Sequence, residues 1–94
     1  MIVDVVIPAY NEEGSIAKVI ESLPKDVIRR IIVADNNSRD RTAEIARRAS
    51  AIVVPTPRQG YGSACLAALA KVANDPPEVV VFIDADFSDD PAQL

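Results

Sequence analysis

Residues 79–86 read Val79-Val80-Val81-Phe82-Ile83-Asp84-Ala85-Asp86, an apolar run followed at once by two aspartates. The apolar part is rich in β-branched residues and does not alternate with polar ones, which predicts a strand buried on both faces. A charged side chain is costly inside a sheet but not at its edge. Asp84 and Asp86 are therefore expected just beyond the end of this strand.

The rest of the chain repeats the same kind of unit. Further apolar runs lie at residues 2–7, 31–34 and 51–54. Apolar residues with helical spacing lie between consecutive runs, at residues 16–23, 43–49 and 64–72. Strand and helix alternate, which predicts an α/β fold with a mostly parallel sheet of about four strands and right-handed crossovers. Helices are expected on both faces of the sheet, giving three layers.

The composition limits the classes of partner. The chain has 94 residues, 49% of them hydrophobic, which is enough for one small domain. Its 14 acidic and 10 basic residues give a net charge of -4, which argues against a nucleic-acid partner because no basic face is available to displace counterions. The single cysteine, Cys65, has no intrachain disulfide partner, so a reducing, cytoplasmic setting is expected.

The loops after the predicted strands are the candidate functional region. In an open parallel sheet, ligands bind beyond the carboxyl ends of the strands, in the crevice where the strand order reverses. Most of the unusual polar residues lie in the loops at these ends, at residues 8–14, 35–42, 55–62 and 84–91. The site is therefore expected where these loops meet.

The last of these loops holds a predicted metal site. Two-residue spacing puts the carboxylates of Asp84 and Asp86 on one side of an extended segment. Such oxygen ligands suit Mg²⁺ or Mn²⁺, which take one or two carboxylates and complete their shell with water and substrate phosphate. The alternative is a solvated turn in which an aspartate caps the next helix.

The first two loops contain residues that could contact a nucleoside. Tyr10 could stack on a base, and Glu12 could accept hydrogen bonds from a ribose or a base edge. The small polar residues at 35–38 could read the edge of a base. The alternative for both loops is structural. Asn11 or Glu12 could cap the first helix, and residues 35–38 could form an ordinary turn with Ser38 or Asp40 as the cap of the second helix.

The loop after the third strand contains two glycines and one arginine. Gly60 and Gly62 would let the backbone approach a ligand closely, and the following helix N-terminus favours an anion. Arg58 is the basic residue placed to meet a phosphate. A structural turn explains the glycines equally well. The pairs Arg29-Arg30 and Arg47-Arg48 are expected to be solvated.

Taken together and in order, these segments resemble the N-terminal half of the family 2 glycosyltransferases. The resemblance rests on residues 6–13, 31–42, 60–62 and 84–86. Residues 84–91, Asp-Ala-Asp-Phe-Ser-Asp-Asp-Pro, are most similar to the dolichyl-phosphate or polyprenyl-phosphate sugar synthases. The resemblance implies a Rossmann-like half of a GT-A fold and a donor site for a UDP- or GDP-sugar.

The resemblance also assigns roles to individual residues of the nucleoside pocket. It implies that Pro8, Tyr10 and Glu12 line this pocket and that Asp35 contacts the base or the ribose. The family commonly has a second aspartate where this chain has Asn36. An amide adds a hydrogen-bond donor and removes a charge, which leaves the choice of nucleotide base open.

The implied reaction is an inverting transfer from the nucleotide-sugar to an acceptor, with Asp84 and Asp86 holding the metal ion and the diphosphate. Negative charge develops on the departing diphosphate, and a divalent cation stabilises it. The resemblance places the acceptor site and the catalytic base beyond Leu94, and it makes a lipid phosphate at the cytoplasmic membrane face a candidate acceptor. The 94 residues alone are therefore expected to be inactive in transfer and to associate as homo-oligomers through an uncovered sheet edge.

Two other classes of function compete with a glycosyltransferase. The first is a non-catalytic nucleotide-binding module or a degenerate fragment, which would lack the acceptor part. The second is a receiver-like domain, in which clustered aspartates bind Mg²⁺ beside a phosphorylated aspartate. A receiver needs an acidic pair after the first strand, and Pro8-Ala9-Tyr10 does not supply one.

Overall fold

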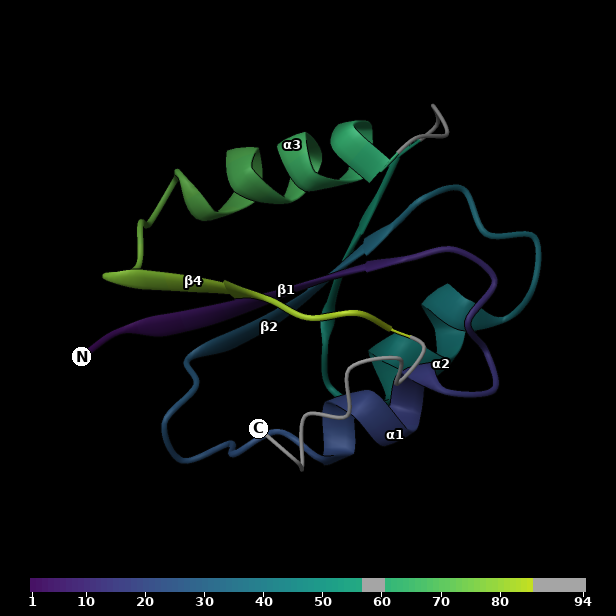
Figure 1. Cartoon of the computed structure of the whole chain (residues 1–94), viewed down its shortest axis with the longest axis horizontal. Coiled ribbons are helices and arrows are strands. Elements are labelled where there is room, and N and C mark those ends of the chain that lie inside the picture. Colours follow the sequence, from purple (N-terminus) through teal and green to yellow (C-terminus); the bar gives the residue numbers. More distant parts are fainter. Residues whose placement is uncertain (57–60, 86–94) are drawn as a thin grey trace.

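The computed structural model describes residues 1–56 and 61–85 of the chain. Strands and helices alternate from the first element to the last, as the sequence predicts (Figure 1). The elements are β1 (Val3–Ala9), α1 (Ile16–Glu21), β2 (Arg30–Asp35), α2 (Thr42–Arg48), β3 (Ile52–Pro55), α3 (Tyr61–Val72) and β4 (Val79–Phe82). Within the described ranges, no helix is long and apolar enough to cross a membrane.

Within the described residues, the sheet has four parallel strands in the order β3-β2-β1-β4. Val6 of β1 is in register with Ile32 of β2 on one side and with Phe82 of β4 on the other. The chain moves outward from β1 to β2 and β3, and then returns to the opposite side of β1. The strand order therefore reverses between β1 and β4, where such sheets bind their ligands.

Helices cover both faces of the sheet, so the predicted three-layer arrangement is confirmed (Figure 1). On one face, α1 and α2 pack on β1 and β2 through a cluster that includes Ile16, Val19, Ile20, Val5, Ile7, Val33 and Ala46. On the other face, the α3 stripe of Ala64, Ala68 and Val72 packs on Val6, Ile32 and Ala34. The two alanines bring α3 close to the sheet because they have almost no side chain to accommodate.

The prediction that all strands are buried on both faces is wrong for β3 and β4. The central strands β1 and β2 are almost wholly buried, but both outer strands are partly exposed. In β4, 38% of Val79 and 44% of Phe82 are accessible. A continuous apolar run identifies a strand, but it does not separate a central strand from an edge strand.

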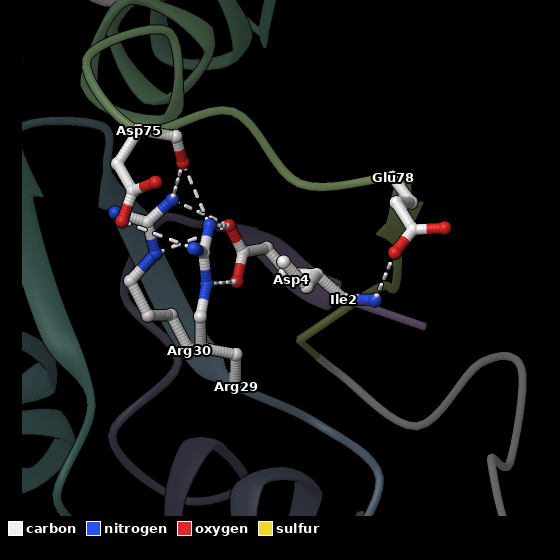
Figure 2. Close-up of polar contacts among 6 residues, drawn as sticks. All are labelled: Ile2, Asp4, Arg29, Arg30, Asp75 and Glu78. Carbon is white, nitrogen blue, oxygen red and sulfur yellow. Dashed lines mark hydrogen bonds and ion pairs between the residues drawn. The ribbon is translucent and has the colours of Figure 1, made fainter.

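The prediction that Arg29 and Arg30 are solvated is wrong for Arg30, which is only partly exposed; Arg29 is exposed but also forms ion pairs (Figure 2). Both guanidinium groups donate hydrogen bonds to the carboxylate of Asp4, which is 0% exposed, at Nη2–Oδ2 distances of 2.8 and 2.6 Å. Both also donate to the main-chain carbonyl of Asp75 at 2.7 Å. The amino ends of β1 and β2 are thereby joined to the α3–β4 connection. Arg48, by contrast, is on the surface and pairs with Glu44.

The two arginines stabilise the ionised form of Asp4. Burial by itself would raise the pKa of this carboxyl group, because it disfavours the charged form. The hydrogen bonds and positive charges of Arg29 and Arg30 outweigh burial and lower the pKa of Asp4 from 3.8 to about 2. Asp4 is therefore a structural charge at the end of the sheet opposite to the candidate site.

Candidate nucleotide-sugar site

A pocket lies at the carboxyl ends of β1 and β4, where the strand order reverses. Its walls come from the ends of β1, β2 and β4 and from the first turns of α3. The lining residues are Pro8, Ala9, Tyr10, Glu12, Asn36, Ala64, Asp84 and Ala85. The fold therefore brings together five of the residues singled out in the sequence, which are Pro8, Tyr10, Glu12, Asn36 and Asp84.

The loops after β1 and β2 are joined by a reciprocal pair of hydrogen bonds. The backbone N–H of Asn11 donates to Ser38 Oγ at 2.9 Å, and the backbone N–H of Arg39 donates to Asn11 Oδ1 at 2.9 Å. Asn11 has a φ of 52°, in the left-handed region that asparagine tolerates better than most residues. These hydrogen bonds therefore join the two loops into one unit.

Glu12 is held by a buried threonine. Its backbone N–H donates to Thr42 Oγ1 at 2.8 Å, and the Thr42 hydroxyl donates to the carboxylate of Asp40. Thr42 is 0% exposed. Asp40 also accepts the backbone N–H groups of Thr42 and Glu13, at 2.9 and 3.3 Å. Although burial alone would raise the pKa of Asp40, these hydrogen bonds outweigh it and lower the pKa.

The sequence alternatives for these two loops are partly realised. Asp40 accepts the Thr42 N–H at the start of α2, as a helix-capping residue does. At the start of α1 the N-cap position belongs to Ser15, without a side-chain cap, and Glu12 contributes its main-chain carbonyl instead. Glu12 also lines the pocket.

Asp35 and Asn36 occupy different positions at the end of β2. Asp35 is 7% exposed, and its Oδ1 accepts the backbone N–H of Ser38 at 3.2 Å inside the turn. Asn36 lines the pocket, and its backbone N–H donates to the carbonyl of Ala9 at 2.8 Å. Successive residues of a strand point to opposite sides. The neutral amide therefore faces the pocket, and the carboxylate supports the turn.

Asp84 reaches the pocket from the end of β4. The backbone N–H of Ile83 donates to the carbonyl of Val6 at 3.0 Å, which continues the β1–β4 pairing up to Asp84. Asp84 is partly exposed, whereas Ala85 is 4% exposed and packs in the core on the α1 side. Asp86, Arg58 and Gly60, the other predicted ligand contacts, lie outside the described residues.

The donor set of the pocket is compatible with a hard divalent cation. Asp84 and Glu12 bring carboxylate oxygens to its wall, and Asn36 brings an amide. Over residues 1–56 and 61–85, no group of three or more potential metal-ligating side chains occurs. Mg²⁺ and Mn²⁺ commonly take one or two carboxylates and leave their other positions to water and phosphate.

The sequence did not identify two residues of the site, one that lines the pocket and one that holds a lining residue in place. Ser15 donates from its hydroxyl to the carbonyl of Ala85 at 2.6 Å, and Ala64 forms part of the wall. Ser15 has a weak signal, because a serine directly before an apolar helical stretch is read as an N-cap. Ala64 has no signal in the sequence, because it is one of several alanines in the same helix.

The sequence as a whole matches a known family. The family described as Glycosyl transferase family 2 matches residues 4–94. The chain belongs to this family. A glycosyltransferase of Mycobacterium tuberculosis, itself uncharacterised, is 46% identical over 92 residues, which is 98% of this chain and 40% of the relative. An undecaprenyl-phosphate 4-deoxy-4-formamido-L-arabinose transferase of Pseudomonas aeruginosa is 31% identical, over 99% of this chain and 30% of the relative.

Solved structures of a sugar-phosphate synthase match the fold described above. Glucosyl-3-phosphoglycerate synthase of M. tuberculosis in complex with Mn²⁺ and UDP-glucose gives a TM-score of 0.77 at 36% identity, over 89% of this chain and 33% of that one. Its complex with Mn²⁺, UDP and glucosyl-3-phosphoglycerate gives 0.76 at 35% identity, over 88% and 33%. The predicted Rossmann-like, GT-A-type fold is confirmed. The chain spans less than half the length of these relatives.

Proposed function

We propose that this chain binds the donor in a glycosyltransferase that moves a sugar from a nucleotide-diphosphate sugar to an acceptor with inversion. The observation that carries the proposal is the pocket at the reversal of strand order, which gathers Tyr10, Glu12, Asn36 and Asp84 from three separate strand ends. Family membership supplies the reaction class. The geometry supplies a place where a nucleoside and a diphosphate can be held side by side.

The nucleoside is assigned to the β1 and β2 side of the pocket. Tyr10 is 41% exposed at the wall and offers an aromatic face to a base. Glu12 offers a hydrogen-bond acceptor and Asn36 an amide for the ribose or the base edge. Pro8 also lines the pocket, and Asp35 fixes the turn after β2. We propose UDP as the nucleotide, because a synthase with a similar fold is solved in complex with UDP and with UDP-glucose. GDP is the alternative.

The diphosphate and a Mg²⁺ or Mn²⁺ ion are assigned to Asp84 and Asp86. The related synthase is solved with Mn²⁺ beside UDP-glucose, and Asp84 brings a carboxylate to the pocket of this chain. The bound ion would supply Lewis-acid stabilisation to the charge that develops on the departing diphosphate. Arg58 and Gly60 are proposed to meet the same phosphates from the loop before α3.

The acceptor and the catalytic base are proposed to belong to a part of the protein beyond Leu94. On this view the 94 residues are the donor-binding half of a larger glycosyltransferase domain, and they do not complete the transfer alone. A lipid phosphate is the proposed acceptor, since a relative is named as an undecaprenyl-phosphate sugar transferase. An ionised phosphate needs little help from a base. The reaction would then take place at the cytoplasmic face of the membrane.

We also propose that the 94-residue chain forms homo-oligomers through β4. This strand pairs with β1 on one side, and it exposes Val79, Val81 and Phe82 at 38%, 38% and 44%. The other edge strand, β3, ends in Pro55, but β4 contains neither proline nor charge to block pairing with another strand. Size-exclusion chromatography across a concentration series should show a dimer. A monomer at every concentration would contradict this proposal.

The donor-site proposal is tested by calorimetric titration of UDP, GDP and their sugar conjugates into the chain, with Mn²⁺ and again with chelator. One nucleotide should bind, and the metal should be required for tight binding. Asp86→Ala should weaken that binding by about 100-fold while the circular dichroism spectrum stays unchanged. If no nucleotide binds in either condition, an incomplete or degenerate fragment is the better description, since a non-catalytic nucleotide-binding module would still bind.

A further inference from the structure

Ser15 joins the two halves of the pocket. It lies at the N-cap position of α1, and its hydroxyl donates to the main-chain carbonyl of Ala85, 70 residues away, at 2.6 Å. Glu12 Oε2 lies 3.5 Å from the same hydroxyl. A serine hydroxyl has one proton to donate, and the shorter contact receives it. The carbonyl of Ala85, the residue after Asp84, is therefore hydrogen-bonded to the start of α1.

Both ends of this link are fixed in the structure. The backbone N–H of Ser15 donates to the carbonyl of Glu12 at 3.1 Å, and its own carbonyl accepts the N–H of Val19 at 3.0 Å. Ala85 is 4% exposed and packs in the core beneath α1. A displacement of the loop after β1 would therefore be passed through Ser15 to the segment that follows β4.

We infer that Ser15 is a positioning residue that couples the nucleoside loop, residues 10–12, to Asp84 and Ala85 at the end of β4. The inference rests on the donor-site function proposed above. Ser15 does not line the pocket wall, so it acts through the carbonyl of Ala85 and not by touching the ligand. Outer hydrogen bonds of this kind hold metal-binding segments in place.

If Ser15 has this role, the part of UDP binding that depends on Mn²⁺ should also depend on the Ser15 hydroxyl. Ser15→Ala should weaken the binding of UDP in the presence of Mn²⁺ by about tenfold. Binding of UDP with chelator should stay the same, because Asn11 and Glu12 are still held by Ser38 and Thr42. A residue that only supported the fold would weaken both kinds of binding together.

Ser22→Ala is the matched control on the same helix. Ser22 Oγ donates to the carbonyl of Val19 at 2.7 Å, so this variant also removes a hydroxyl-to-backbone hydrogen bond, at the other end of α1. Both kinds of UDP binding should remain as in the wild type. Should Ser15→Ala fail to fold, Ser15→Thr and Ser15→Val form a second pair, equal in shape but with and without the hydroxyl.

The experiment is calorimetric titration of UDP into the wild type and these variants, with Mn²⁺ and with chelator. A wild type that shows no Mn²⁺-dependent binding of UDP overturns the proposed function, and the inference with it. A wild type that binds, together with variants lacking the hydroxyl that bind equally well, overturns the inference alone. Equal weakening with Mn²⁺ and with chelator also overturns it. The inference is supported if variants without the hydroxyl bind UDP more weakly with Mn²⁺ but not with chelator, and if Ser15→Thr binds as the wild type does.

Discussion

The two ends of the parallel sheet use carboxylates in opposite ways. At the amino ends of β1 and β2, Asp4 is removed from water and its charge is balanced by Arg29 and Arg30 (Figure 2). At the carboxyl ends of β1 and β4, Glu12 and Asp84 are partly exposed at the wall of a pocket. The guanidinium groups of Arg29 and Arg30 occupy the carboxylate of Asp4, so no metal ion is expected there. The partial exposure of Asp84 at the pocket wall lets a ligand reach it.

The loops at the two ends also differ in what holds them. The end near Asp4 depends on ion pairs, whereas the pocket end depends on hydrogen bonds from backbone N–H groups to Ser38, Thr42 and Asp40. These bonds fix the backbone of the nucleoside loop and leave the side chains of Tyr10 and Glu12 at the pocket wall. The amino end is therefore expected to determine stability, and the carboxyl end to determine binding.

The largest effect on stability is expected from Asp4→Ala. It removes the hydrogen bonds that both guanidinium groups make to a buried carboxylate, which should lower the free energy of unfolding by about 1.5 to 3 kcal/mol. Urea denaturation measures this. Asp75→Ala is the control, because its carboxylate is 71% exposed and pairs with Arg29 at the surface. The control should lose less than about 1 kcal/mol, and equal losses would refute the distinction.

The next largest effect on stability is expected from acid, which protonates Asp4 at the amino ends of β1 and β2. The pKa of Asp4 is lowered from 3.8 to about 2, so its contribution to stability is fully present above pH 3.8 and is lost as the pH falls through about 2. A shift of this size corresponds to about 2 kcal/mol. Urea midpoints measured across this range should fall more steeply for the wild type than for Asp4→Asn. Identical slopes would show that Asp4 does not titrate differently in the folded chain.

A smaller effect is expected from Thr42→Val, at the pocket end. The variant keeps the shape of the side chain but removes the hydroxyl that accepts the Glu12 N–H and donates to Asp40. The free energy of unfolding should fall by about 1 to 2 kcal/mol, and the affinity for UDP should fall with chelator as well as with Mn²⁺. Thr42→Ser, which keeps the hydroxyl, should retain the affinity. An unchanged affinity in Thr42→Val would mean that Glu12 is positioned by other contacts.

Much of the fold follows from patterns that are local in the sequence. Apolar runs and helical spacing are enough to predict the order of strands and helices, and parallel pairing follows from their alternation. The patterns do not reveal that β3 and β4 are edges. The Asp4 cluster is missed because its partners lie 25 and 26 residues away. An aspartate inside an apolar run is nevertheless a signal, since a buried charge requires a partner.

The candidate site is predictable where it depends on strand ends. Pro8, Tyr10, Glu12, Asn36 and Asp84 meet because parallel strands bring their carboxyl ends to one edge of the sheet. Ser15, by contrast, acts through the carbonyl of Ala85, and no sequence pattern records a contact between a side chain and a distant main-chain group.

The central claim is that a metal ion and UDP bind at the carboxyl ends of β1 and β4. Nuclear magnetic resonance with trace Mn²⁺ and saturating UDP tests it most directly, because the paramagnetic ion broadens only amide signals close to it. The account predicts loss of the signals of Asp84, Ala85 and Glu12, while those of Asp4 and Arg30 stay sharp. Broadening centred on Asp4, or spread evenly over the chain, would contradict it.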